Sequence, residues 1–292
     1  MKQLIVNADD LGADKSRNAG IFEAIAAGAV TSVSILPNGP ALTDGLRRIR
    51  ELPRDSVSIG IHFNLSEGKP LSSGLRLLTG PDGCFLGKKS AQRLLVRSSC
   101  PELENEIRQE LHAQIAALRN AGVHPDHSDG HQHVHILPAV LKPAADAARR
   151  NGIAWVRIPE EPQAFQAGTV SSGIHEEAHF FSFHAEAARP VLNALGFCTT
   201  ILFRGLYFKG RLPASHWVEF LKSIPHGLTE LMVHPGRVAG NSATGPFSGF
   251  STRERETELE ALTDGRFRMA LAETGVGLTR FPKTELDERC EF

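Results

Sequence analysis

The sequence predicts a single α/β domain built around a parallel β-sheet. Short segments rich in branched apolar residues alternate repeatedly with amphipathic segments, which is typical of strand–helix units in a parallel sheet, open or closed. We find no internal repeat, low-complexity tract or linker, and barrels of strands and helices reach 292 residues as one domain. We therefore treat residues 1–292 as one domain.

The first half of the chain contains three predicted strands, separated by segments whose apolar residues recur at helical spacing. A segment rich in Gly, Ser and Lys then predicts a long surface excursion. A strongly amphipathic helix with Pro101 near its start comes after it. The expected strands cover residues 3–8, 31–36 and 57–63, the helices 21–28, 42–51 and 101–120, and the excursion 64–99.

The second half continues the alternation after a strand-to-loop segment, PDHSDGHQHVH. Residues 159–177 match neither the helical nor the strand periodicity. Residues 253–274 fit one or two helices. The remaining expected helices cover residues 137–150, 186–195 and 214–223, and the strands 153–158, 199–203, 229–234 and 276–279.

Composition excludes several classes of protein. The formal net charge is −1 and no polybasic run occurs, which argues against nucleic-acid and membrane-surface binding. No apolar stretch is long enough to span a bilayer, and the N-terminal apolar run is too short for a signal peptide. We therefore predict a cytoplasmic protein. A homodimer is compatible with these features. Without a CxxC pair, reduced thiols are expected at Cys84, Cys100, Cys198 and Cys290.

Polar residues able to bind metal or move protons gather where the predicted strands end. The carboxyl ends of parallel strands meet on one face, and that face carries the active site in such folds. Taken singly, these residues have structural alternatives, such as a helix N-cap for an aspartate, a packed strand-end histidine, or a salt bridge for the arginine. The residues are Asp9, Asp10, His62, Asp129, His131, His133, His135, Arg157 and His234.

The alternating histidines at 131, 133 and 135 are the strongest single indication of a metal site. On an extended segment they would share one side, and two imidazoles with one carboxylate leave coordination positions open on zinc. Some of the clustered residues should instead orient ligands or contact substrate. The alternatives are a fortuitous His-rich loop or a surface metal site.

Six segments in one order resemble the YdjC-like carbohydrate deacetylases, which include the bacterial chitooligosaccharide deacetylases. They are IVNADDLG, TSVSILPNGP, IGIHFNLSEGKPL, PDHSDGHQHVHILP, WVRIP and ELMVHPG, between Ile5 and Gly236. The resemblance implies a single-domain distorted (β/α) barrel that is TIM-barrel-like. Two departures are Leu11, where the family has an aromatic residue, and GHQHVH with Gly130 and Gln132, where it often has SHHHVH.

The resemblance also implies a role for each site residue. Asp10, His62 and His131 would bind one divalent metal, with zinc as first choice and magnesium as the alternative. Asp9 would be the catalytic base, held by Arg157, and a protonated His234 would act as general acid or contact substrate. Asp129, His133 and His135 would bind substrate or support the ligands.

The expected reaction is hydrolysis of the N-acetyl group of an acetylated amino sugar, with release of acetate. The alternatives are a metal-dependent hydrolase or lyase acting on another substrate, such as a different amide, an ester or a phosphoester, and a non-catalytic carbohydrate-binding or metal-storage protein. Phosphoester chemistry often uses two metals, whereas the sequence shows ligands for one. The sequence does not identify which acetylated sugar is the substrate. Residues 64–99 and 159–177 are expected to frame the cleft.

Overall fold

A parallel sheet forms the centre of the molecule. The computed structural model describes residues 1–165, 170–238, 247 and 252–284. The strands follow the order β5-β4-β3-β2-β1-β7-β6, and β8 pairs with the start of β1. The strands are β1 (Lys2–Leu11), β2 (Ser32–Ile35), β3 (Ser58–Phe63), β4 (His127–Gly130), β5 (Trp155–Val156), β6 (Leu202–Arg204), β7 (Gly227–Val233) and β8 (Gly277–Leu278).

The two ends of this sheet approach each other and make it a distorted barrel. Trp155 in β5 bridges in parallel to Cys198, which precedes β6. Val156 N donates to the Cys198 carbonyl at 3.0 Å, and Cys198 N donates to the Ala154 carbonyl at 2.9 Å. Since β5 and β6 are the outermost strands of the order, this contact links the edges of a curled sheet. The predicted α/β barrel class is confirmed.

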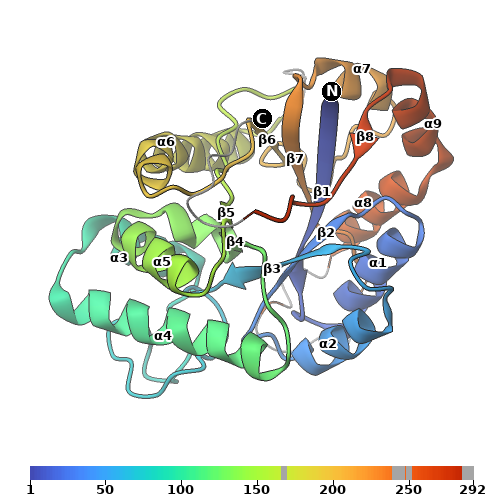
Figure 1. Ribbon diagram of the computed structural model, residues 1–292. Helices are drawn as coiled ribbons and strands as arrows, with labels where there is room; N and C mark the ends of the chain where they lie inside the picture. Colours follow the sequence, from blue (N-terminus) through green and yellow to red (C-terminus); the bar gives the residue numbers. More distant parts are fainter. Residues whose placement is uncertain (166–169, 239–246, 248–251, 285–292) are drawn as a thin grey trace.

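Helices surround the sheet, with β1 and β7 near the centre of the view in Figure 1. In the described part of the chain, no helix is long and apolar enough to cross a membrane. The helices are α1 (Lys15–Ala26), α2 (Leu42–Glu51), α3 (Lys88–Arg97), α4 (Pro101–Asn120), the 3-10 helix η1 (His131–Ile136), α5 (Pro138–Arg150), α6 (Ser172–Ala194), α7 (Trp217–Ser223), α8 (Arg253–Thr263) and α9 (Gly265–Thr274).

Alternation along β1 places apolar and polar layers inside the barrel. Leu4, Val6 and Ala8 pack in the main apolar core, whereas Ile5 packs in a separate cluster that includes Trp155 and Leu228. Because side chains alternate along a strand, Asn7 and Asp9 follow Ile5 on the same side. The barrel interior is therefore apolar at its amino end and polar toward the strand ends, where the site lies.

Several expected boundaries differ from the structure. Residues 64–99 are not only a surface excursion, because they contain α3 and the buried side chains of Leu65, Leu78 and Leu95. Helix α6 begins at Ser172, well before the expected start at residue 186, and includes Pro190. The expectation of four reduced thiols is wrong at Cys198, which is disulfide-bonded, whereas Cys84 and Cys100 are free. Cys290 lies outside the described residues.

Candidate active site

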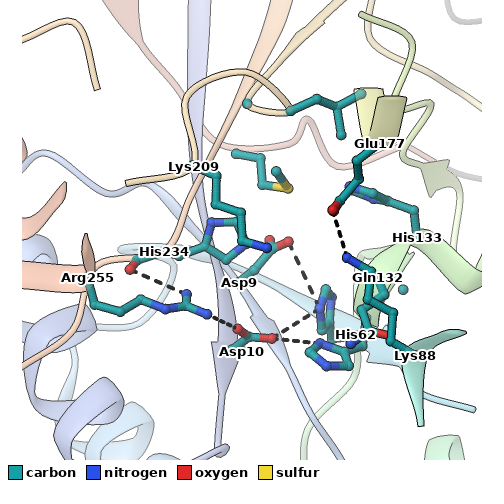
Figure 2. A pocket seen from close by; sticks show the side chains of 15 residues that line it. Asp9, Asp10, His62, Lys88, Gln132, His133, Glu177, Lys209, His234 and Arg255 are labelled. Atoms are coloured by element: carbon teal, nitrogen blue, oxygen red, sulfur yellow. Dashed lines mark hydrogen bonds and ion pairs between the residues drawn. The ribbon is translucent and has the colours of Figure 1, made fainter. Parts of the chain in front are cut away.

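Three buried side chains from separate segments bring potential metal-ligand atoms together. Asp10 lies at the end of β1, His62 near the end of β3, and His131 directly after β4. Asp10 Oδ1 is 2.9 Å from His131 Nδ1 and 3.5 Å from His62 Nε2. One ligand atom from each residue lies within 4.8 Å of the others. Figure 2 shows Asp10 and His62 on the floor of the pocket, with Asp9 beside them.

Backbone geometry explains how two adjacent aspartates serve one site. Neighbouring side chains on a regular strand point to opposite faces. Asp10 has φ of 69°, in the left-handed region that Asp tolerates better than most residues. The register with β2 also shifts between Ala8 and Leu11. This irregularity turns Asp10 toward the space that Asp9 already faces.

Each candidate histidine ligand is oriented by a carboxylate at its remote nitrogen. His62 Nδ1 lies 2.7 Å from Asp129 Oδ1, which leaves Nε2 toward Asp10. His131 Nε2 lies 3.2 Å from Glu67 Oε2, which leaves Nδ1 toward Asp10. Such contacts fix the tautomer and ring orientation of metal-binding histidines. Sequence reasoning did not single out Glu67, although it lies in a segment expected to frame the cleft, residues 64–99.

Charge around His62 favours its protonated form when no metal is bound. Burial alone would lower the pKa of His62, but the carboxylates of Asp129 and Asp9 and a contact with Asp10 raise it to about 10. Burial likewise opposes ionisation of Asp10, yet His131 and His62 hold its pKa well below the usual value. The site therefore has a surplus of negative charge that protons or a cation can compensate.

Arg157 holds three carboxylates beneath the site. Its Nη1 and Nη2 each lie 2.7 Å from an oxygen of Asp9. Nη2 is also 2.8 Å from Asp129 Oδ2, and Nε is 2.7 Å from Glu230 Oε1. A forked guanidinium contact fixes both the position and the plane of a carboxylate. Asp9 is thus oriented from below by Arg157, while Asn7 Nδ2 donates to its Oδ1 at 2.7 Å.

A second group, Asp9 with His62 and Asp129, also has ligand atoms within 4.8 Å. It shares His62 with the first group, and both of its carboxylates already contact the Arg157 cation. A metal ion there would compete with that cation for the same oxygens. Asp10, His62 and His131 are therefore the better metal-binding group. Asp10 Oδ2 is also contacted by Arg255 Nη2 at 3.0 Å.

Comparison with known proteins identifies the family. A family model described as YdjC-like protein matches residues 3–273. The chain belongs to the YdjC-like family. It is 37% identical to a carbohydrate deacetylase of Mus musculus, with 94% of this chain and 93% of that protein covered. It is also 37% identical to a carbohydrate deacetylase of Homo sapiens, over 94% of this chain and 89% of that one.

A solved structure supports the fold of this YdjC-like protein. A candidate cellobiose-phosphate cleavage protein from Enterococcus faecalis superimposes with a TM-score of 0.70 at 22% identity. The match covers 96% of this chain and 97% of the other. At this identity the likeness shows the shared fold alone.

The expected one-sided array of alternating histidines in this YdjC-like protein is not what the structure shows. His131 to Ile136 form η1 and not an extended segment, and Gln132 and His133 have φ of 52° and 54°. His135 Nε2 donates to the Arg157 carbonyl at 3.0 Å, and burial lowers the pKa of His135 to about 4. His133 packs its ring on Phe181 with centroids 4.6 Å apart. His131 alone of the three approaches Asp10.

Strain in η1 is stored beside the pocket. Left-handed backbone at a residue other than glycine costs on the order of 1–3 kcal/mol and is retained where the surroundings enforce it. Gln132 and His133 are consecutive in this conformation, and both line the pocket. Burial also places the pKa of His133 well below its usual value, so its ring is neutral.

The expected acid, His234, follows β7 and lines the same pocket. Its backbone N–H donates to Glu258 Oε2 at 2.6 Å, and its Nδ1 is 3.9 Å from Glu258 Oε1. Burial, and then the Arg255 charge, hold the pKa of His234 well below its usual value. The resting ring is therefore neutral, unlike the protonated state expected from sequence. Its catalytic role stays a prediction.

The wall of the pocket includes residues from both segments that were expected to frame the cleft, residues 64–99 and 159–177. Lys88 at the start of α3 and Glu177 in α6 form an ion pair of 2.8 Å, and Figure 2 shows them opposite Lys209. Leu206 and Met232 line the same space and add an apolar surface. The pocket therefore combines a charged floor with a mixed polar and apolar wall.

Proposed function

We propose that this protein is a metal-dependent hydrolase that removes the N-acetyl group of an acetylated amino sugar and releases acetate. One observation carries the proposal: Asp10, His62 and His131 converge beside Asp9, whose carboxylate is held by Arg157. A ligand group next to an oriented carboxylate suits hydrolysis of an amide by activated water. The relatives named carbohydrate deacetylase support the same substrate class.

The donor set fits one divalent ion. Two imidazole nitrogens and one carboxylate face a common space, and their remote atoms are held by Asp129 and Glu67. This set suits zinc first and magnesium second, and three protein ligands leave room for water and substrate. A bound ion of this kind polarises a carbonyl and lowers the pKa of water.

Asp9 is the proposed base. Its Oδ2 lies 4.0 Å from His62 Nε2, so it borders the space into which the ligand atoms face. Arg157 and Asn7 hold the carboxylate in place, and it can accept the proton of the attacking water. The acetyl methyl group can lie against Leu206 and Met232, which give the pocket its apolar side.

His234 is the proposed proton donor to the leaving amine. Since burial keeps its ring neutral at rest, the proton must reach it during the reaction. The proton taken up by Asp9 passes to His234, which then donates it to the amine nitrogen as the carbon–nitrogen bond breaks. Glu258, which accepts from the His234 backbone, fixes the position of this residue.

Acetate release tests the function. The purified protein is incubated with a panel of acetylated amino sugars, with added Zn²⁺ or Mg²⁺ and with a chelator. We expect acetate and free amine in equal amounts, loss of turnover with chelator, and recovery when metal is restored. Acetate release that is unaffected by complete metal removal would contradict the mechanism. A failure of every acetylated sugar in the panel would contradict the substrate class.

A further inference from the structure

Two residues between the candidate ligands and the pocket wall have an unusual backbone. Gln132 (φ 52°, ψ 30°) and His133 (φ 54°, ψ 29°) are consecutive non-glycine residues in the left-handed region. Such residues persist where the structure over-determines them, and they cluster at ligand-binding sites. Both residues line the same pocket as Asp9, Asp10 and His62.

The same two residues carry polar atoms that no described residue satisfies. Neither Oε1 nor Nε2 of Gln132 has a hydrogen-bond partner, and the same holds for Nδ1 of His133. Burial raises the pKa of the Glu67 carboxyl, whereas His131 and, after it, a close polar contact from the Gln132 amide lower it. That contact does not meet hydrogen-bond geometry, so the amide keeps hydrogen-bonding capacity. Buried polar groups are normally hydrogen-bonded, so unpaired ones at a pocket wall are available to hydrogen-bond a ligand.

Each of the two flanking histidines has at least one hydrogen-bonding side-chain atom. His131 contacts Asp10 and Glu67, and His135 donates to the Arg157 carbonyl. The ring of His133 is held from behind, because Phe181 and Phe203 meet it edge-on at centroid distances of 4.6 and 6.1 Å. His135 Nδ1 is also buried without a partner, but His135 does not line the pocket. In the described segment from His131 to Ile136, the unpaired atoms that belong to pocket-lining residues are those of Gln132 and His133.

We propose that Gln132 and His133 form a sugar-recognition subsite that hydrogen-bonds the hydroxyl groups of the bound amino sugar and sets specificity for it. An amide offers both a donor and an acceptor, and an imidazole offers ring nitrogens that can do the same. This combination matches hydroxyl groups, which also donate and accept. The inference rests on the proposed function and identifies the residues that recognise its substrate.

The test compares three single variants. Gln132→Leu removes the amide at nearly constant size, and His133→Phe keeps an aromatic ring against Phe181 and Phe203. The matched control is Gln92→Leu on α3, because Gln92 Nε2 is also buried without a partner but does not line the pocket. The probes are N-acetylglucosamine, its β-1,4-linked dimer and N-acetylgalactosamine, which differs from N-acetylglucosamine in one hydroxyl configuration. Metal content and melting temperature are measured for each variant.

We expect Gln132→Leu and His133→Phe to raise KM about tenfold for the best probe, as expected for one lost hydrogen bond, with kcat changed much less. Discrimination between the two acetylated monosaccharides should shrink as well. Metal content and melting temperature should stay near those of the parent, and Gln92→Leu should leave all kinetic values unchanged.

Unchanged KM and unchanged discrimination in both variants, with an active parent, would overturn the subsite and leave the proposed function standing. An equal change in Gln92→Leu would also overturn it, since the effect would then be general. Loss of metal in either pocket variant would assign these residues to the metal site and contradict the inference. An inactive parent on every acetylated sugar would remove the proposed function and the subsite together.

Discussion

The floor and the wall of the pocket are built on different principles. The pocket floor consists of residues at strand ends, namely Asp9, Asp10, His62 and His131. The pocket wall consists of residues from loops and helices, namely Lys88, Gln132, His133, Glu177 and Lys209. Each floor residue contacts an oppositely charged or hydrogen-bonding partner, whereas Gln132 and His133 in the wall keep unpaired atoms. Under the proposed function, the floor carries out the chemistry and the wall recognises the substrate.

The largest expected effect is at the floor, in Asp9→Asn. An amide nearly preserves the shape of the carboxylate but cannot accept a proton. Arg157 keeps Asp129 and Glu230 as partners, so the fold should persist. We expect kcat to fall about 10²- to 10⁴-fold with metal content unchanged. Turnover near that of the parent would make Asp9 a structural residue and move the search for the base elsewhere.

His234→Gln tests whether the pocket-lining histidine after β7 takes part in the chemistry. If His234 passes a proton to the amine, kcat should fall about 10²-fold while metal content stays constant. The pH dependence of kcat/KM should also change shape, because one proton-transfer group is gone. A variant that alters KM alone, with the parental pH profile, would make His234 a substrate contact.

Ionisation of Glu161 should make the stability of the protein depend on pH. Glu161 Oε2 accepts from the backbone N–H groups of Gly205 and Leu206, at 2.9 and 2.7 Å, behind the pocket wall. Burial raises the pKa of Glu161 from 4.5 to about 7, against the opposing charge of Arg204. A folded pKa above the unfolded value gives stability that is complete below about pH 4.5. That stability is lost as the pH rises through about 7.

A shift of this size corresponds to about 3 kcal/mol of unfolding free energy. In Glu161→Gln, which cannot ionise but keeps an acceptor oxygen, this pH-dependent loss should disappear. Urea unfolding of parent and variant between pH 5 and 8 measures it. Parallel pH curves for the two proteins would show that Glu161 does not titrate in this range.

A smaller effect is expected where a loop supports the floor. Asn64 holds the turn that carries Glu67, since Asn64 Nδ2 donates to the Glu67 carbonyl at 2.7 Å. In Glu67→Ala the turn should survive, but His131 loses the partner of its Nε2. We expect metal affinity to fall about 10- to 100-fold in a chelator competition assay. Glu177→Ala is the matched control, and an equal loss there would show a general charge effect.

The floor could be predicted from sequence because strand ends in a parallel sheet must converge. Asp9, Asp10 and His62 therefore came together once the strands were recognised. Glu230 was missed, although a charged residue inside the apolar strand ELMV was a usable indication of a buried ion pair. The position of Asp10 could not be foreseen in detail, since it depends on a left-handed residue and a register shift.

For the wall, the sequence predicted two of the contributing segments, residues 64–99 and 159–177, but not their geometry. The geometry of the wall depends on how the segment from residue 64 to 99 folds back and on the early start of α6, which brings Glu177 to Lys88. Alternating histidines suggested an extended strand, and only the backbone of η1 shows that His131, His133 and His135 have different neighbours. Loop conformation follows from many distant contacts, and periodicity does not report it.

The central claim is that Asp10, His62 and His131 hold one metal ion that the reaction requires. The direct measurement is metal per chain in the parent, in His131→Ala and in His112→Ala, which changes an exposed histidine on α4. Elemental analysis after dialysis and acetate release are recorded on the same samples. We predict one ion per chain and activity in the parent and in His112→Ala, and loss of both in His131→Ala. Undiminished metal in His131→Ala would contradict this ligand set.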